Sequence, residues 1–351
     1  MTEAAPAVRF RNVTILFGDR PDAALPLADG GGTRAQIQEA TGQVLGVHDC
    51  SLDVGEGEIV VLMGLSGSGK STLLRAVNGL NPITRGAVEV RGENGMTDVA
   101  TCSAAALREI RRNRVAMVFQ QFGLLPWRTV AENVGFGLEL SGLSRRVRAE
   151  CVERQLELVG LSDWGDRRVG ELSGGMQQRV GLARAFATEA PILLMDEPFS
   201  ALDPLIRTRL QDELLELQAR LRRTILFVSH DLDEAFKLGQ RIAIMEGGRI
   251  VQEGAPRDIY TDPADGYVAD FVAHMNPLGV LTARDVMAPV EVDKGPLEAA
   301  GAPLLDPETP VTDVMAALQH ATSLPVGREN TPVGHVTRQS LLTRLGRGQI
   351  S

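Results

Sequence analysis

The segment Gly64–Ser71 has the residue types and the spacing of a phosphate-binding loop. It reads Gly-Leu-Ser-Gly-Ser-Gly-Lys-Ser and fits G-x-x-x-x-G-K-[S/T] at every defined position. It lies between the apolar run Glu58–Met63 and a helical run that starts at Thr72. The glycines allow a tight backbone around a phosphate, Lys70 supplies a mobile positive charge, and Ser71 supplies an oxygen for Mg²⁺. The sequence therefore predicts a nucleoside triphosphate site rather than a glycine-rich turn without a ligand.

A second group of charged residues follows two other apolar runs. Asp196 and Glu197 end the run that starts at Pro191, and His230 follows the run Thr224–Val228. In an open α/β sheet, residues that follow the carboxyl ends of strands lie where ligands bind. Asp196 is suited to hold Mg²⁺, directly or through water, and Glu197 to polarise a water in line with a γ-phosphate. His230 taken alone would be read as a surface histidine.

Composition limits the class of protein. The chain has 351 residues, 44% of them apolar and 23% charged, as in a globular protein with one large and one smaller domain. The formal charge of −9 argues against a nucleic-acid binder with a general basic surface. The three cysteines form no C-x-x-C pair, which fits a reducing compartment. We see no leader-like start and no apolar run of bilayer length, so we expect a cytosolic chemistry in which another chain spans any membrane.

The elements that position these residues alternate between strand and helix. This order predicts an α/β fold with a mainly parallel sheet. Asp19–Gly46 is interpreted as an insertion with one short helix at Thr33–Ala40, and Leu124–Glu171 as an inserted helical subdomain. The predicted strands cover residues 8–18, as an edge strand, and 45–47, 50–54, 58–63, 85–90, 115–119, 191–198, 224–228, 241–245 and 249–253; other helices cover 104–112 and the segments after residues 71, 173 and 204.

Three local features have specific interpretations. Phe17, at the end of the first predicted strand, is either part of the core or an aromatic ring that stacks on adenine. Ser173 precedes a helical run and is a suitable N-terminal cap. The helix that follows Pro204 is predicted to place four leucines on one face: Leu210, Leu214, Leu217 and Leu221.

Taken together, these segments resemble the ATP-binding subunits of ABC transporters. Leu172–Arg179 matches the family signature, Gln120 the Q-loop, Asp196 and Glu197 the Walker B pair, Ser200–Asp203 the D-loop and His230 the switch histidine. The resemblance covers roughly residues 8–275. It implies a RecA-like P-loop NTPase core with an antiparallel β part, in a nucleotide-binding domain of residues 1–275. The helical subdomain would cover about 123–171 and a family-type insertion about 19–46.

The resemblance also implies roles for single residues, with ATP and Mg²⁺ as cofactors. Gln120, Glu197 and His230 would take part in hydrolysis, and Ser71, Gln120 and Asp196 would hold Mg²⁺. The nucleotide would be contacted by Phe17, Gly64, Ser66, Gly67, Ser68, Gly69, Lys70, Ser71, Thr72, Ser173, Gly174, Gly175, Gln178 and Asp203.

The resemblance implies partners as well. Ser173–Gly175 starts a helix and offers N–H groups to phosphate, but one side of the nucleotide is already occupied by the phosphate loop. A head-to-tail homodimer would supply the other side. The loop Gln121–Val130, with Trp127, is either core or part of the groove that receives a short helix of a transmembrane permease subunit. A periplasmic or extracellular substrate-binding protein and a peripheral position on the cytoplasmic face of a bacterial inner membrane follow from the same resemblance, and no nucleic acid does.

Within the family, several segments look like the subunits of importers for quaternary amines, namely glycine betaine, proline or choline. They include the phosphate loop, Arg75–Leu80 and Ala201–Arg207. His274–Leu278 and Ala283–Met287 look closest to choline importers. The alternatives are the ATPase of a different importer, a soluble ABC ATPase, which would need a coiled coil or tandem cassettes, and a phosphotransferase, which would not need the signature.

Residues 276–351 resemble a linker followed by one cystathionine-β-synthase-type (CBS) repeat. A helix is predicted at Thr312–Gln319, strands at 323–326 and 333–336, and a last helix at Ser340–Leu345. Ser340 stands where nucleotide-binding repeats commonly have aspartate. We therefore expect a small α/β appendage with a structural or dimerising role, rather than an adenosine sensor.

Overall fold

The computed structural model describes residues 6–273, 275–289, 303–328 and 331–345. It divides into two compact units, which are described separately. Unit 1 comprises Met1–His230 and Gln240–Glu253, and unit 2 comprises Asp231–Gly239 and Gly254–Ser351. No helix among the described residues is both long enough and apolar enough to cross a bilayer.

The main sheet of unit 1 has six strands in the order β10-β9-β3-β8-β7-β6. Its parallel pairs are β3 with β8 and β9, and β7 with β6 and β8. Every residue of β3, β7 and β8 is buried, which is why these strands read as uninterrupted apolar runs. The predicted mainly parallel α/β sheet is thus confirmed. Its strands are β3 (Ile59–Met63), β6 (Val115–Val118), β7 (Ile192–Asp196), β8 (Thr224–Val228), β9 (Arg241–Glu246) and β10 (Arg249–Gly254).

The second sheet of unit 1 has the order β2-β1-β4-β5, and its pairs are antiparallel. Its strands are β1 (Pro6–Phe17), β2 (Val44–Gly55), β4 (Arg85–Gly92) and β5 (Gly95–Asp98). Two predictions were wrong here. The first strand is interior, because it pairs with both β2 and β4. The two strands expected at 45–54 form one strand, since Asp49 adopts a φ of 52° and the register shift in the pairing with β1 keeps both halves in the ladder.

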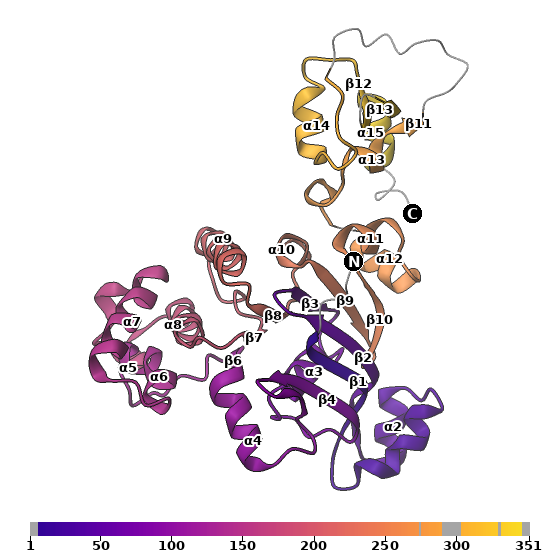
Figure 1. The fold of residues 1–351 in the computed structure, drawn as a ribbon. Helices are drawn as coiled ribbons and strands as arrows, with labels where there is room; N and C mark the ends of the chain where they lie inside the picture. The colour runs from indigo at the N-terminus through magenta and orange to yellow at the C-terminus, as the bar shows by residue number, and fades with distance from the viewer. Residues whose placement is uncertain (1–5, 274, 290–302, 329–330, 346–351) are drawn as a thin grey trace. The chain divides into compact units, whose positions relative to one another are not determined.

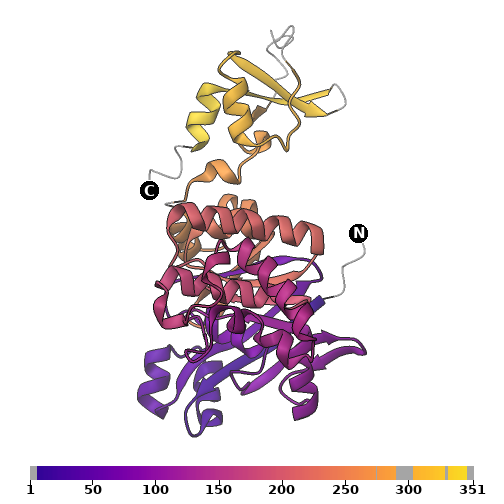
Figure 2. The ribbon, with the colours of Figure 1, turned by 90° about the vertical axis from the view of Figure 1, so that its left-hand side faces the viewer.

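Apart from those of the insertion between β1 and β2, the helices of unit 1 fall into two groups (Figures 1 and 2). Beside the sheet lie α3 (Lys70–Ala76), α4 (Ala104–Glu109), which continues into a π-helical turn (Ile110–Arg114), and α9 (Pro204–Leu221). The helical subdomain contains α5 (Val130–Val134), α6 (Phe136–Leu140) and α7 (Arg145–Leu158), which pack against α8 (Gly174–Ala187). The prediction of a helical stretch was right from Val130 onward, whereas residues 119–129 form a loop.

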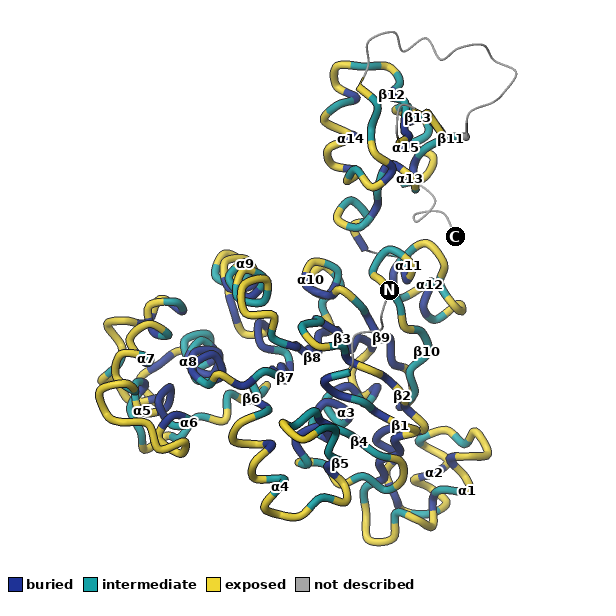
Figure 3. The backbone as a smooth tube through the Cα atoms, in the orientation of Figure 1, coloured by how far each residue is buried: buried dark blue, intermediate teal, exposed yellow. Residues whose placement is uncertain are grey.

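The predicted leucine face of α9 is only half buried. Leu210 and Leu214 are in the core, Leu217 is partly covered, and Leu221 is 47% exposed. Figure 3 shows the change from buried strands to the exposed outer faces of α7 and α9.

The insertion between β1 and β2 is more helical than predicted. Besides α2 (Arg34–Thr41), it contains a 3-10 turn (Pro21–Ala24) and α1 (Leu25–Asp29). Thr33 caps α2 with Gln36 in a reciprocal capping box. A small core holds the insertion against both strands and consists of Leu16, Ala24, Ala28, Ile37 and Leu45.

Unit 2 contains a three-stranded antiparallel sheet of order β11-β13-β12. Its strands are β11 (Ala288–Pro289), β12 (Ser323–Arg328) and β13 (Thr331–Thr337), and its helices are α10 (Leu232–Leu238), α11 (Pro256–Thr261), α12 (Gly266–Val272), α13 (Ala283–Val286), α14 (Val311–Ala317) and α15 (Arg338–Leu345). The predicted tail elements are all present, within a few residues. The domain boundary at residues 275/276 stays a prediction, and His274 and residues 290–302 lie outside the described residues.

An ion pair inside unit 2 generates a pH prediction. Arg257 Nε donates to both carboxylate oxygens of Asp285 at 2.9 Å, and the Asp285 side chain is only 7% exposed. Burial would raise the pKa of Asp285, but hydrogen bonds from Arg257 and Thr282 outweigh burial and hold the pKa below its usual value. Because the folded-state pKa is depressed, this stabilisation is present above the unfolded pKa, about 3.9, and is lost as the pH falls through the folded value.

We therefore expect Asp285→Asn to lower the Tm of unit 2 at pH 7. The difference from the wild type should shrink as the pH falls below about 4. Differential scanning calorimetry across this pH range measures it. Asp270→Asn, at an exposed position on α12, is the control and should leave the Tm unchanged. A wild-type advantage that stays constant down to pH 2.5 would contradict the role of the ion pair.

Candidate functional site

The predicted phosphate loop connects the buried strand β3 to α3. Gly64, Gly67 and Gly69 have φ values of 138°, 79° and 107°, in the region that favours glycine. A Cβ on Gly64 would lie 2.1 Å from the carbonyl oxygen of Met245, and one on Gly69 2.7 Å from that of Gly46. The loop therefore requires glycine at both positions for backbone shape and for space. Ser66 and Gly67 are exposed, which leaves the loop open on one side.

Lys70 lies at the first position of α3 and folds back over the loop. Its Nζ donates to the carbonyl oxygens of Gly64 at 2.7 Å and Leu65 at 2.9 Å. Burial lowers the pKa of the Lys70 ammonium from its usual value, while Glu197 and Asp196 act in the opposite direction. The cation is thus held at the mouth of the loop by weak neutral acceptors, which a phosphate would replace with charged ones.

Asp196 ends β7 as a fully buried carboxylate with three donors. Ser71 Oγ donates to its Oδ1 at 2.6 Å, and Arg75 donates to its Oδ2 through Nε at 3.1 Å and Nη2 at 2.7 Å. Ser71 and Asp196, predicted together as Mg²⁺ ligands, are therefore brought together. Sequence reasoning missed Arg75, although its position four residues after Ser71 on α3 puts both on one helix face.

Glu197 is held by three groups from two segments of the chain. Gln120 Nε2 donates to its Oε2 at 3.1 Å, and His230 Nδ1 lies 3.3 Å from its Oε1. Its backbone adopts a φ of 48°, which is uncommon for a residue with a side chain, and its N–H donates to the carbonyl oxygen of Val228. The three predicted hydrolytic residues therefore form one cluster at the carboxyl edge of the main sheet.

The signature segment begins α8, as predicted. Ser173 caps the helix by accepting from Met176 N at 3.4 Å. A Cβ on Gly175 would lie 3.1 Å from the carbonyl oxygen of Ala201. Within the described residues, no hydrogen bond or ion pair joins Ser173, Gly174 or Gly175 to the phosphate loop.

Gln178 makes hydrogen bonds inside the protein. It is 1% exposed, its Nε2 donates to the carbonyl oxygen of Glu197 at 3.0 Å, and its Oε1 accepts from Ala201 N at 2.9 Å. Both ends of the amide are thus used inside the protein. Gln178 connects α8 to the Walker B strand and the D-loop, and its predicted contact with a nucleotide stays a prediction.

Phe17, Thr72 and Asp203 complete the predicted set. A Cβ on Gly46 would lie 2.8 Å from Phe17 Cε2 and 2.9 Å from Thr72 Cγ2, so the aromatic ring lies beside the start of α3. Phe17 is half buried and packs one side on the core. Asp203 caps α9 by accepting from Ile206 N at 3.0 Å.

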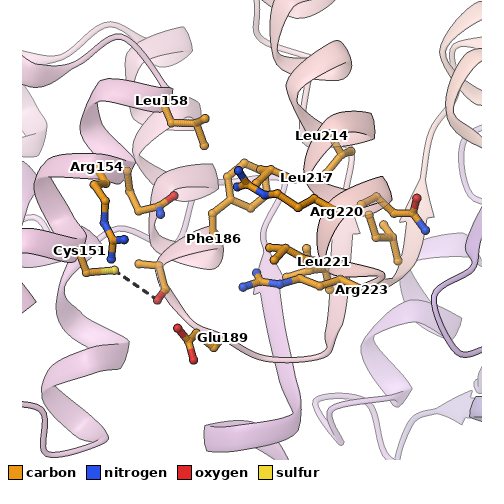
Figure 4. Close-up of a pocket in the computed structure, with 15 residues that line it drawn as sticks. Cys151, Arg154, Leu158, Phe186, Glu189, Leu214, Leu217, Arg220, Leu221 and Arg223 are labelled. Atoms are coloured by element: carbon orange, nitrogen blue, oxygen red, sulfur yellow. Dashed lines mark hydrogen bonds between the residues drawn. The ribbon is translucent and has the colours of Figure 1, made fainter.

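Two surfaces bear on the predicted groove. Trp127 is 66% exposed, so this part of the loop 121–130 is not core. A separate cavity of about 290 Å³ opens where α7, the end of α8 and the end of α9 meet (Figure 4). Apolar side chains and the charged side chains of Arg154, Arg220, Arg223 and Glu189 line it together. None of the residues 121–130 lines it.

Comparison with known proteins gives this arrangement a family. The family described as "ABC transporter" matches residues 47–200. The chain is 50% identical over 279 residues to the glycine betaine/proline betaine transport system ATP-binding protein ProV of Escherichia coli, across 80% of this chain and 69% of that protein. It is 47% identical over 298 residues to the trimethylamine N-oxide transport system ATP-binding protein TmoW of Ruegeria pomeroyi, across 85% of this chain and 86% of that protein.

Solved structures agree on the fold. A dimeric ATP-binding cassette in a post-hydrolysis state, bound to ADP and Pi, matches with a TM-score of 0.61 and 30% identity, across 71% of this chain and 98% of that chain. The P-loop α/β core predicted from the sequence is therefore confirmed.

The double role of Gln178 generates a stability prediction. Gln178→Glu keeps an acceptor for Ala201 N but cannot donate to the Glu197 carbonyl, and it buries a carboxylate. We expect the free energy of unfolding of unit 1 to fall by about 1–3 kcal/mol. Urea denaturation followed by tryptophan fluorescence measures this, since Trp127 and Trp164 both lie in unit 1. Gln38→Glu, on the exposed side of α2, is the matched control; equal stability of the two variants would remove Gln178 from this role.

Proposed function

Because the chain belongs to the ATP-binding subunits of ABC transporters, we propose that it hydrolyses ATP to drive import of choline or a related compound, glycine betaine or proline. The observation that carries the chemistry is the Glu197 carboxylate, held between Gln120 and His230 beside a phosphate loop. ATP would bind with its phosphates in the loop, where Lys70 exchanges its carbonyl partners for phosphate oxygens.

Glu197 is the proposed general base. It would accept a proton from the water that attacks the γ-phosphate, and its orientation is fixed on both sides. Gln120 donates to one carboxylate oxygen and leaves the other for the water. His230, 3.3 Å from that second oxygen, is placed to keep the carboxylate and the water in line.

The residues at the end of β7 fit Mg²⁺. The Ser71 hydroxyl and the Asp196 carboxylate are hard oxygen donors 2.6 Å apart, and the amide oxygen of Gln120 is a third. The bound ion would neutralise charge on the phosphates. Arg75 donates to the second oxygen of Asp196 and so orients the carboxylate toward Ser71.

A second copy of the chain is part of the proposal. Ser173–Gly175 starts a helix of 14 residues, whose N–H groups and positive dipole end suit a phosphate. These residues have no link to their own phosphate loop, so a head-to-tail homodimer would bring them to the ATP of the partner. The related cassette bound to ADP and Pi is itself dimeric.

Permease subunits are the proposed membrane partners, and the chain would lie peripherally on the cytoplasmic face of the membrane. Two separate features could receive a short helix, namely exposed Trp127 in the loop 121–130 and the cavity between α7, α8 and α9. In Figure 4, Arg220 and Arg223 extend from the α9 side toward Phe186 and Glu189. Arginines beside apolar side chains suit a partner helix that carries both apolar and acidic side chains. A substrate-binding protein on the other side of the membrane would deliver the amine.

The substrate class rests on the relatives. The ATP-binding proteins of a glycine betaine/proline betaine system and of a trimethylamine N-oxide system share 50% and 47% identity with this chain. Choline remains the narrowest form of the proposal, based on the segments Ala283–Met287 and His274–Leu278. No residue of an ATP-binding subunit reaches the transported molecule, so only transport chemistry can separate these amines.

Replacing the base tests the hydrolytic mechanism. We expect Glu197→Gln to lower ATP hydrolysis roughly 10²–10⁴-fold while ATP binding is retained, because the amide cannot accept the proton. Phosphate release and the Kd of a fluorescent ATP analogue measure the two effects. Glu216→Gln, an exposed position on α9, should behave as the wild type. Hydrolysis at the wild-type rate by the Glu197 variant would exclude this residue as the base.

Reconstitution tests the transport function. We expect the chain, with its permease and binding protein in liposomes, to hydrolyse ATP faster when choline, glycine betaine or proline is supplied. Stimulation by choline alone would support the narrow form, and stimulation by glycine betaine or proline would replace it. A photo-crosslinker on Cys151, which lines the cavity between α7, α8 and α9, should capture the permease in the same vesicles. No stimulation by any of these amines would overturn the substrate class.

A further inference from the structure

The insertion between β1 and β2 is tied firmly to both sheets of unit 1. Arg85 of β4 donates to both carboxylate oxygens of Asp29 at 2.8 and 2.6 Å, and His48 Nε2 lies 2.9 Å from the same carboxylate. Arg249 of β10 donates to the carbonyl oxygen of Ala28 at 3.1 Å. With its own apolar core, the insertion is a fixed part of the unit rather than a loose loop.

Arg34, the first residue of α2, connects this insertion to the phosphate loop. Its guanidinium donates to the carbonyl oxygen of Gly67 in the loop and to that of Gly46 in β2. A Cβ on Gly69 would lie 3.2 Å from Arg34 Nη2, and one on Gly248 3.0 Å from the same atom. The guanidinium therefore occupies the space behind the loop, between β2 and the turn that joins β9 to β10.

The arginine is kept there at an energetic cost. A cation at the first turn of a helix opposes the helix dipole. Arg34 Nε is enclosed without a partner, and no carboxylate among the described residues pairs with the side chain. Burial lowers the pKa of Arg34, and the like charge of Arg249 acts in the same direction. Neither helix stability nor an ion pair explains the residue, so we look for its purpose in the phosphate loop.

The geometry points to a positioning role: we propose that Arg34 fixes the peptide unit between Gly67 and Ser68 in the orientation that binds the phosphates of ATP, so that the insertion sets the affinity for ATP. In a planar trans peptide the C=O and N–H point in opposite directions. Holding the Gly67 oxygen behind the loop turns the N–H of Ser68 into it, where it donates to the Leu65 oxygen at 3.1 Å. The positive charge adds attraction for the triphosphate. This inference rests on ATP binding at the loop.

Nucleotide binding by three variants tests it. Arg34→Ala should raise the Kd of a fluorescent ATP analogue roughly 10–100-fold, the effect expected when hydrogen bonds from a charged group are lost. KM for ATP should rise by a similar factor, and kcat at saturating ATP should fall by much less. Arg34→Lys should recover part of the affinity, because an ammonium can reach one carbonyl. Arg20→Ala removes an exposed cation from the same insertion and should leave Kd unchanged.

The outcomes separate three cases. A Kd for Arg34→Ala within twofold of the wild type would overturn the inference. The inference would also be overturned if Arg34→Ala and Arg34→Lys lost the same affinity for ATP and both had a similarly lowered Tm, since that pattern indicates a purely structural role. Lys70→Ala is the control that should not bind the ATP analogue. If the wild-type protein binds the analogue no better than Lys70→Ala, the proposed ATP site itself is refuted, and the inference about Arg34 is refuted with it.

Discussion

The buried carboxylate of Asp196 is the interaction on which the rest of the site depends. It is fully enclosed, and removing a charge from water is costly unless the charge is paired and hydrogen-bonded. Ser71 and Arg75, one helical turn apart on α3, supply the donors. The phosphate loop and the catalytic strand are therefore locked to each other, because neither can move without exposing or unpairing this carboxylate. Because Glu197 is the next residue in the chain, the contacts of Asp196 also fix its position.

The parallel sheet brings the other residues of the site close to Asp196. β3, β8 and β7 are neighbours in the sheet, so the phosphate loop, His230 and Glu197 emerge at one edge although they are far apart in the sequence. Gln178 adds a connection from outside the sheet, since its amide joins the start of α8 to the Glu197 carbonyl and to Ala201. A shift of α8 would therefore displace or break the hydrogen bond to the backbone of Glu197, the proposed base. The helical subdomain packs against α8, so it is connected through Gln178 to the residue proposed as the base.

Sequence reasoning identified the groups that lie in contiguous motifs and missed those that act across the fold. Lys70, Ser71 and Glu197 are recognisable because local backbone shape and chemistry coincide in a few residues. The role of Gln178 and the contact of Arg75 depend on tertiary distances that no spacing encodes. The same limit explains the errors in the fold. β1 alternates as an edge strand would, yet β4, more than sixty residues later, pairs with its second edge. In the sequence, the bulge at Asp49 looks like the end of a strand, because a residue with left-handed backbone angles usually interrupts the alternating pattern of a strand.

Ser340, in the segment that resembles a CBS repeat, shows that the role of a residue depends on its hydrogen bonds. Ser340 Oγ accepts from Thr337 N at 3.0 Å and donates to the Thr337 carbonyl oxygen at 3.1 Å, while Ser340 N donates to Thr337 Oγ1 at 3.0 Å. The hydroxyl is thus used in capping α15. A short hydroxyl engaged with its own backbone stabilises the helix start but offers little to a ligand. The bonds of Ser340 therefore agree with the structural or dimerising role expected for these residues, which stays a prediction.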